Sequence, residues 1–329
     1  RIEPGSKFII TRYVNVALFG ASGLLGWSIR QELKNRGFHI FEYYQNPGSE
    51  KILQSFRRLD LTDEQQVKSE LLDLWPDAII NCAAISSPDA VNKDPNHARE
   101  INVYAAQRLA EISSHLHARF IHISSDMVFE GSDRAYRSTD NPNPLSEYGL
   151  QKLEAEKRVL AAADENIVVL RITLLNGNSL RGNRSPHERI FDSLKKKNPI
   201  ILFDDEYRQP CSTENVASVV VELLERPNLN GIFHWAGSEV ITRYELGKKI
   251  LERFGFSSKY ITRSSVHNCP EHLGKRPTNL TLELSPLVGK IKTKPACTSQ
   301  QLEGLMVPND LFQWYRKHAD DPSKYVLRI

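Results

Sequence analysis

The sequence predicts an α/β protein with a Rossmann-type, doubly wound parallel sheet and a smaller, irregular C-terminal region. From Tyr13 onward, short apolar runs alternate with longer amphipathic segments, which is the rhythm of βαβ units. The apolar runs are continuous, as in parallel strands that are buried on both faces. After about Leu174 this rhythm loosens, and Gly, Pro, Asn and charged residues become frequent.

The expected elements follow in chain order. Strands are expected in YVNVALF, FHIFEYY, DAIINCAAI, RFIHISS and NIVVLRI. Helices are expected at about 24–35, after Thr62, at about 96–115 and at about 147–162. Thr62, with Gln65 three residues later, fits a capping box at the start of the second helix. Thr242 with Glu245 fits a capping box later in the chain.

Composition limits the function classes. The 329 residues are 40% hydrophobic, enough for a sizeable core, and 43 basic against 40 acidic residues give a net charge of +3. This balance provides no concentrated basic surface for nucleic acid. No apolar stretch approaches the roughly 20 residues of a membrane span, and residues 1–12 lack the apolar core of a signal peptide. The histidines show no ligand spacing, so no protein-bound metal is expected.

Four cysteines are spread along the chain without CxxC spacing, at positions 82, 211, 269 and 297. They are too few for a disulfide framework in a chain of this size, so reduced thiols are expected. We therefore expect a cytoplasmic protein.

A glycine-rich turn follows the first expected strand and opens the first expected helix. In GASGLLG, backbone N–H groups and the helix dipole converge where a pyrophosphate would bind, and a side chain would hold the phosphates away. A merely tight turn is the alternative. The turn makes residues 13–173 a predicted NAD(P)-binding Rossmann domain. Its expected cofactor-binding residues are Gly20, Ser22, Gly23, Leu24, Leu25 and Gly26.

Tyr148 and Lys152 lie four residues apart on an expected helix and so share one face. Bringing a phenol, with a pKa of about 10, close to neutrality takes roughly 4 kcal/mol. An ammonium about 4 Å away supplies about 4 kcal/mol at an effective dielectric constant of about 20. The pair is therefore a candidate proton donor. A solvated amphipathic helix surface is the alternative.

The spacing G-x-x-G-x-x-G, the serines of ISSDMVFEG and the helix NPLSEYGLQKLEAEK occur in one order along the chain. Together they resemble the extended short-chain dehydrogenase/reductases. Within that group they are similar to dTDP-4-dehydrorhamnose reductase and its relative, the regulatory beta subunit of methionine adenosyltransferase. The resemblance runs from about residue 14 to about residue 284. It extends through RQP at 208–210 and RPTN at 276–279.

The resemblance implies further cofactor contacts. Asp60 and Leu61 correspond to the family's adenine-contacting pair, and Cys82, Ala83 and Ala84 to a turn that passes close to the cofactor. An acid at the end of the second strand would hold the ribose hydroxyls of NAD, but Tyr44 stands there. NADP(H) is therefore the expected cofactor, with NAD(H) as the alternative. The candidate cations for its 2′-phosphate are Lys51, Arg57 and Arg58, each of which also fits an ordinary surface charge.

For catalysis, the resemblance implies a reductase that transfers hydride to the C4 ketone of a nucleotide-linked 4-keto-6-deoxy sugar. Tyr148 would protonate the alkoxide, and Lys152 would bind the ribose and lower the phenol pKa. Ser125, with Ser124 as the alternative, would hydrogen-bond the carbonyl. Residues 174–329 are expected to form mainly a substrate-binding region, with segments at about 211–237 returning to the sheet. The substrate contacts expected are Asp126, Met127, Leu174 and Arg208.

Two positions depart from the sugar reductases, which usually carry Tyr where Met127 stands and Trp where Leu174 stands. These changes keep a second hypothesis open, namely a non-catalytic, NADP-binding regulatory subunit that docks on a methionine adenosyltransferase catalytic subunit. An epimerase or dehydrogenase of another nucleotide sugar is a third. Dehydration is disfavoured, because Met127 replaces the Glu that would follow the Asp. A homodimer is open, and no nucleic-acid or membrane partner is expected.

Overall fold

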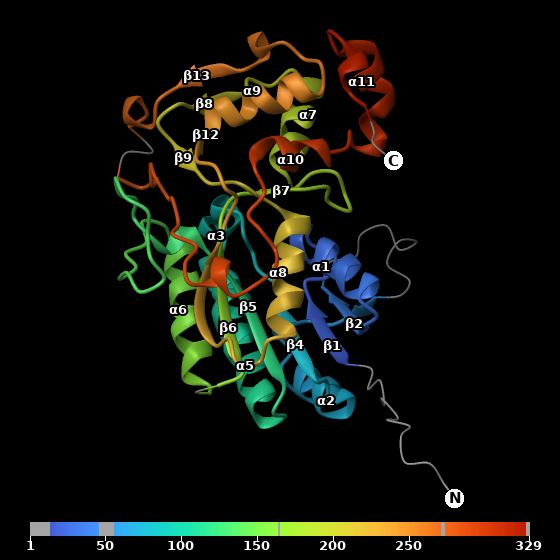
Figure 1. The fold of residues 1–329 in the computed structure, drawn as a ribbon, viewed down its shortest axis with the longest axis vertical. Helices are drawn as coiled ribbons and strands as arrows, with labels where there is room; N and C mark the ends of the chain where they lie inside the picture. Colours follow the sequence, from blue (N-terminus) through green and yellow to red (C-terminus); the bar gives the residue numbers. More distant parts are fainter. Residues whose placement is uncertain (1–13, 46–55, 164, 271–273, 327–329) are drawn as a thin grey trace, which may run out of the picture.

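The computed structural model describes residues 14–45, 56–163, 165–270 and 274–326. Its centre is a seven-stranded sheet with the order β11-β6-β5-β4-β1-β2-β3, in which every neighbouring pair is parallel (Figure 1). This confirms the predicted fold class. The sheet strands are β1 (Asn15–Phe19), β2 (His39–Tyr44), β3 (Arg57–Arg58), β4 (Ala78–Asn81), β5 (Arg119–Ser125), β6 (Ile167–Ile172) and β11 (Gly231–Trp235).

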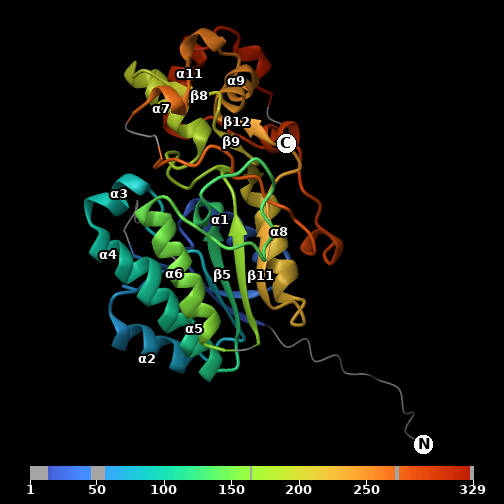
Figure 2. The same cartoon turned by 90° about the vertical axis from the view of Figure 1, so that its left-hand side faces the viewer.

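Helices cover both faces of the sheet, because the strands are apolar on both sides. On one face α1 (Leu24–Asn35) and α8 (Thr213–Leu224) pack side by side against strand residues such as Val16 and Ile80. The other face is covered by α2 (Glu64–Leu74), α5 (Ala106–His115) and α6 (Glu147–Ala161). Figure 2 shows α5 and α6 on one side of the sheet and α8 on the other.

The C-terminal region lies beyond the carboxyl ends of the strands, at the top of Figure 1. Its core is rich in aromatic rings, among them Phe191, Phe254 and Tyr315. Short strand pairs connect it, namely β7 (Leu175–Asn176) with β10 (Cys211–Ser212), β8 (Ile201–Phe203) with β13 (Thr262–Ser264), and β9 (Tyr207–Arg208) with β12 (Ile241–Thr242). Its helices are α7 (Pro186–Lys196), α9 (Arg243–Arg253), α10 (Thr298–Glu303) and α11 (Phe312–His318).

Two local predictions need correction. The capping box at Thr62 is wrong, because Asp63 caps α2 by accepting a hydrogen bond from the N–H of Gln66. Thr62 instead donates to Asp60. The helix expected at about 96–115 is divided into α4 (Pro95–Arg99), a π-helical turn at 100–105, and α5. Of the capping box predicted at Thr242, the N-cap half is present, since the Thr242 hydroxyl accepts from the N–H of Glu245.

In the π-helical turn, Asn102 is buried and accepts a hydrogen bond from the N–H of Ile85 at 2.8 Å. Its amide donates to Gln151 on α6 at 2.9 Å. The turn therefore ties the segment after β4 to the helix that carries Tyr148 and Lys152.

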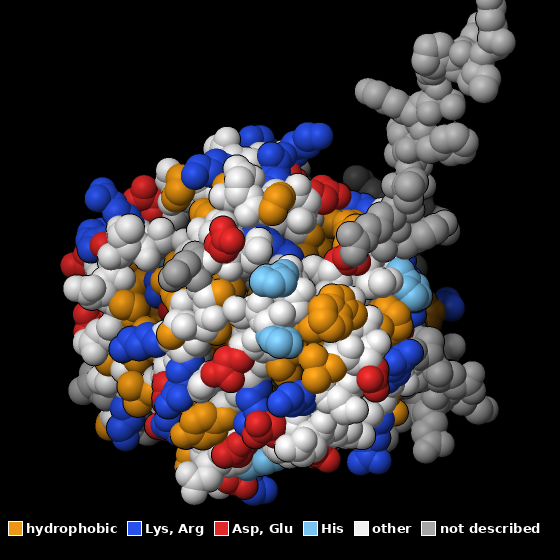
Figure 3. Space-filling model, turned by 90° about the horizontal axis from the view of Figure 1, so that it is seen from below, with side chains coloured by type: hydrophobic (Ala, Val, Ile, Leu, Met, Phe, Trp, Pro, Cys, Tyr) orange, Lys and Arg blue, Asp and Glu red, His pale blue; other side chains and the backbone are white. Residues whose placement is uncertain are grey.

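Some predictions fall outside the described residues, namely those on Lys51, on Tyr13 and on the segment 1–12. Within the described ranges, no helix is long and apolar enough to cross a membrane. Viewed from below (Figure 3), basic and acidic side chains are interspersed over the face.

Candidate functional site

The glycine turn joins β1 to α1 at the carboxyl end of the sheet. Gly20 has a φ of +75°, and a Cβ there would lie 2.7 Å from the backbone N of Ala83. A Cβ on Gly26 would lie 2.1 Å from the carbonyl oxygen of Gly20. Gly23 begins α1 without a side-chain cap, so no side chain satisfies the first N–H groups of the helix. Glycine lets the turn pack closely and leaves these donors for an anion.

A cavity lies beside this turn, and eight of the residues predicted to bind the cofactor line it. Those that line it are Gly20, Ser22, Gly23, Tyr44, Leu61, Cys82, Ala83 and Ala84. Six predicted cofactor-binding residues do not line it, namely Leu24, Leu25, Gly26, Asp60, Tyr148 and Lys152. Leu25 is buried in the core below the turn. The carboxylate of Asp60 accepts hydrogen bonds from the N–H and hydroxyl of Thr62 and from Gln45.

The cavity also has a wall that the sequence did not predict. Ser179, Arg181 and Arg184 line it from the segment between β7 and α7, more than 150 positions after the glycine turn. No local pattern marks these residues, because only the long-range fold brings the segment over the turn. The other lining residues that were missed are Phe19, Tyr43, Gln45, Leu59, Ile85, His97 and Ile101.

Among the described lining residues there is no carboxylate. The candidate cation Arg57 pairs with Glu70 at 2.6 Å and lies over the ring of Phe41, while Arg58 does not line the cavity. Tyr44 packs edge-on against Phe56. The end of β2 therefore offers an aromatic ring and an amide, without an acid for a ribose diol.

The three predicted catalytic residues lie at the end of β5 and on α6. Ser125 ends β5, and its hydroxyl interacts with the phenol of Tyr148. Close packing at Gly149 makes this meeting possible, since a Cβ there would lie 2.3 Å from the carbonyl oxygen of Met127. Ser124 donates instead to the carboxylate of Glu156. Of the two candidate serines, Ser125 is the one beside Tyr148.

The predicted lowering of the Tyr148 pKa is wrong in direction. Burial raises the pKa of Tyr148 to about 12, the interaction with the Ser125 hydroxyl opposes this, and the charge of Asp126 adds to it. Lys152 is not among the groups that shift this pKa. The phenol is therefore protonated throughout the neutral range.

The ammonium of Lys152 contacts residues of β5 and does not act on the phenol of Tyr148. Its Nζ donates to the carbonyl of Ile123 at 2.6 Å and lies 3.2 Å from Nε2 of His122. Burial lowers the Lys152 pKa to about 8, while Glu156 counteracts this. Glu156 is itself fixed by a buried ion pair with Arg171 at 2.7 Å. The lysine is thus held in a rigid polar core next to Cys82, whose pKa burial raises to about 12.

Asp126 follows Ser125 and connects this group to the C-terminal region. It is 4% exposed, its Oδ1 accepts from the Ser125 hydroxyl at 3.1 Å, and its Oδ2 has no hydrogen-bond partner among the described residues. Burial raises its pKa to about 6, although the charge of Arg208 lowers it. The guanidinium of Arg208 donates to the carbonyls of Pro277 and Thr278. Arg208 therefore holds the segment at 277–278 close to Asp126, and this segment and the arginine form a wall above Asp126.

Glu206 gathers a cluster of arginines around Arg208. It pairs with Arg208 at 2.9 Å and with Arg276 at 2.8 Å. Arg243, at the start of α9, adds a third guanidinium to this environment, and its Nη1 is buried without a hydrogen-bond partner in the described structure. Burial lowers the Arg243 pKa to about 10. Three guanidiniums around one glutamate leave an excess of positive charge near Asp126.

Comparison with known proteins identifies the family. The sequence profile described as the RmlD substrate binding domain matches residues 14–306, which is most of the chain. The chain belongs to the RmlD substrate-binding domain family. The resemblance to extended short-chain dehydrogenase/reductases that the motifs predicted is thereby confirmed.

Curated proteins with different names are similar to this chain. The methionine adenosyltransferase 2 subunit beta of Xenopus tropicalis is 34% identical over 86% of this chain and 82% of its own length. A probable low-salt glycan biosynthesis reductase, Agl14, of Haloferax volcanii is 31% identical over 86% and 93%.

Solved structures show the same fold. A hypothetical dTDP-4-dehydrorhamnose reductase from Sulfolobus tokodaii superposes with a TM-score of 0.76 and is 28% identical, covering 89% of this chain and all of that one. A dTDP-4-dehydrorhamnose reductase from Bacillus anthracis, solved in complex with NADP, gives a TM-score of 0.73 at 23% identity. It covers 88% of this chain and 96% of that one.

The two residues that depart from the RmlD-type reductases are both partly buried. Met127 packs on a small apolar cluster that includes Phe129 and Tyr136. Leu174 packs against the aromatic core of the C-terminal region. Neither side chain offers a hydrogen-bond donor to a sugar. Within the described ranges, no group of His, Cys, Asp and Glu is arranged to hold a metal ion.

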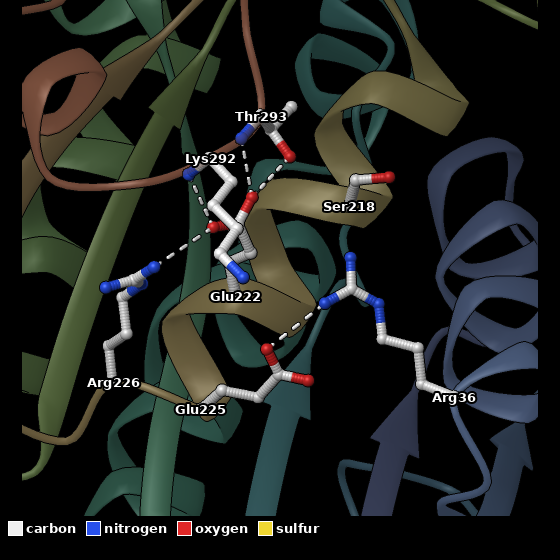
Figure 4. Close-up of a pocket in the computed structure, with 7 residues that line it drawn as sticks. All are labelled: Arg36, Ser218, Glu222, Glu225, Arg226, Lys292 and Thr293. Carbon is white, nitrogen blue, oxygen red and sulfur yellow. Dashed lines mark hydrogen bonds and ion pairs between the residues drawn. The ribbon is translucent and has the colours of Figure 1, made fainter.

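A second hollow lies away from this site, between α1, α8 and the segment at 292–293 (Figure 4). Glu222 on α8 accepts hydrogen bonds from the N–H groups of Lys292 and Thr293, both at 2.7 Å. Arg36, the C-cap of α1, pairs with Glu225, the C-cap of α8, at 3.1 Å. The contacts of Glu222 tie the segment at 292–293 to α8, while the Arg36–Glu225 pair joins the ends of α1 and α8.

Proposed function

We propose that this protein is an NADPH-dependent reductase of the C4 ketone of a nucleotide-linked 4-keto-6-deoxy sugar. The observation that carries the proposal is the assembly of Ser125, Tyr148 and Lys152 next to the cavity of the glycine turn. Cys82 in the cavity wall is close enough to Lys152 for the charge of the ammonium to act on the pKa of the thiol, lowering it against the larger effect of burial. Hydride donor and proton donor would therefore meet at one place.

Each residue has a role that its environment supports. The bound nicotinamide would supply the hydride. Tyr148, whose pKa is about 12, would carry the proton that the new alkoxide takes up. Ser125 would donate a hydrogen bond to the carbonyl oxygen and so hold it beside the phenol. Lys152, fixed by Ile123, would lie where the cofactor ribose approaches α6.

The arginine cluster supports an anionic substrate. Arg243 has a buried donor without a partner in the described residues, and burying an unpaired donor costs free energy. A diphosphate oxygen would satisfy this donor, and the positive charge of Arg276 would favour it. Because Arg208 interacts with Asp126 beside Ser125, a diphosphate at the cluster would place its sugar near Tyr148.

The cofactor proposed is NADP(H), with NAD(H) as the alternative. The described cavity lining contains arginines and no carboxylate, which disfavours recognition of a ribose diol and favours an additional phosphate. The Bacillus anthracis relative with the same fold was solved with NADP. The four cysteines are free thiols, in keeping with the predicted cytoplasmic setting.

The test is a direct assay. Purified protein is mixed with NADPH and dTDP-4-keto-6-deoxy sugar, and the loss of nicotinamide absorbance is followed. We expect turnover in the wild type and a loss of about 10²- to 10⁴-fold in Tyr148→Phe, because general acid catalysis typically contributes this much. NADPH affinity should stay within about twofold. Equal inertness of wild type and Tyr148→Phe would contradict the proposal.

A second function is favoured by a different observation. Relatives at 31–34% identity are named as beta subunits of methionine adenosyltransferase 2, and Met127 and Leu174 lack the polar groups of the sugar reductases. The protein would then bind NADP(H) without turnover and dock on the catalytic subunit. Size-exclusion chromatography of the mixture with a methionine adenosyltransferase catalytic subunit tests this. A stable complex together with no turnover would replace the first function by the second.

A further inference from the structure

The segment between β7 and α7 brings two arginines from the C-terminal region to the cofactor cavity. Arg181 and Arg184 line the cavity together with Ser22 of the glycine turn and Tyr44 of β2. The arginines thus line the same cavity as the glycine turn and the end of β2, the two elements where the phosphates and the adenosine ribose of a dinucleotide would bind.

A buried carboxylate holds this segment in shape. Glu188, 2% exposed, accepts hydrogen bonds from the N–H and the hydroxyl of Ser179, both at 2.7 Å. It also accepts from the N–H groups of Arg184 at 2.7 Å and Ser185 at 2.9 Å. The turn between Ser179 and Arg184 is therefore built before any ligand binds, and little ordering would oppose binding.

A second anchor fixes the base of the segment. The Asn178 amide donates to the carbonyl of Gly304 at 2.8 Å, and its oxygen accepts from the N–H of Met306 at 2.8 Å. Gly182, at a φ of +66°, passes close to Pro308. The loop is thus braced against the C-terminal part of the chain and held over the cavity.

The charges in the cavity select an anion. Its described lining contains Arg181, Arg184 and His97 and no Asp or Glu. Arg184 forms no ion pair with any residue that the structure describes. Near the end of β2, by contrast, Arg57 already pairs with Glu70. The first N–H groups of α1 would bind the pyrophosphate, and Arg181 and Arg184 give the cavity positive charge for another phosphate.

We propose that Arg181 and Arg184 bind the adenosine 2′-phosphate of NADP(H) and set the preference for NADP(H) over NAD(H). The inference rests on the proposed function in one respect, that the cavity holds a nicotinamide dinucleotide. The site takes a phosphate monoester next to the ribose, with guanidinium groups contributed by the C-terminal region. These residues replace the cation that the end of β2 does not supply.

The experiment measures binding and does not need turnover. Affinities of the full chain for NADPH, NADH, 2′,5′-ADP and 5′-AMP are measured by calorimetry, for wild type, Arg181→Ala, Arg184→Ala and the double variant. We expect each single change to weaken NADPH and 2′,5′-ADP about tenfold or more, since a charged hydrogen bond is worth roughly 1.5–3 kcal/mol. NADH and 5′-AMP should change less than about twofold.

The matched control is Lys195→Ala, which removes an exposed cation from α7 outside the cavity and should change none of the four affinities. Arg184→Lys should recover part of the NADPH affinity. Equal losses for NADPH and NADH would place the arginines at the pyrophosphate and overturn the inference, as would unchanged affinities. Arginine-dependent NADPH binding without turnover would support the inference and contradict the reductase.

Discussion

The two halves of the molecule build their sites by different means. In the sheet half, the glycine turn is shaped by close backbone contacts, and Gly26 fits because nothing larger clears the Gly20 carbonyl. In the C-terminal half, the wall above Asp126 is made by charged side chains from distant segments, such as Glu206 and Arg276. The cofactor side therefore depends on shape and the substrate side on buried charge.

The largest effect should come from the shape of the turn. Gly26→Ala places a Cβ against backbone, so we expect the free energy of unfolding to fall by about 3 kcal/mol or more. Gly37→Ala is the matched control, because Gly37 has a φ of +80° but open space around it, and the strain alone costs roughly 1–2 kcal/mol. Urea unfolding measures both. Equal losses would show that close packing at the turn does not matter.

Buried charge should show itself through pH. The pKa of Asp126 is raised to about 6, so the folded state favours the protonated carboxyl, and stability is lost as the pH rises from about 4 to about 6. Asp126→Asn should therefore stabilise the protein by up to about 3 kcal/mol at pH 7.5 and have little effect near pH 4. Denaturant unfolding at the two pH values tests this.

The exposed Asp133→Asn is the control and should change stability by less than about 0.5 kcal/mol. If Asp126→Asn destabilised the protein equally at both pH values, Asp126 would be a structural hydrogen-bond acceptor whose charge carries no cost. The difference between the two halves would then be weaker than described.

The tie between the halves should give the smallest effect. Glu222→Gln leaves one acceptor oxygen for the N–H groups of Lys292 and Thr293, which should cost about 1–3 kcal/mol. Glu225→Gln removes only the exposed pair with Arg36 and should cost less than about 1 kcal/mol. Thermal unfolding compares them. A larger loss for Glu225→Gln would show that the exposed pair between α1 and α8 contributes more to stability than the buried carboxylate of Glu222.

The same contrast explains what the sequence predicted. The fold class followed from the strand and helix rhythm, and the glycine turn could be placed because each is a local pattern. The two arginines at 181 and 184 could not be found, because their place in the cavity depends on the path of the chain after β7. The direction of the Tyr148 pKa was missed for a related reason, since burial outweighs a neighbouring charge that points toward Ile123.

The central claim is that the cofactor cavity and the Ser125–Tyr148 group work on one substrate. The most direct measurement uses NADPH deuterated at the nicotinamide C4 and the dTDP-4-keto-6-deoxy sugar, with mass spectrometry of the product. The account predicts a product sugar that carries one deuterium at C4, formed by the wild type and strongly slowed in Tyr148→Phe. A wild-type protein that binds NADPH tightly but transfers no deuterium would contradict it.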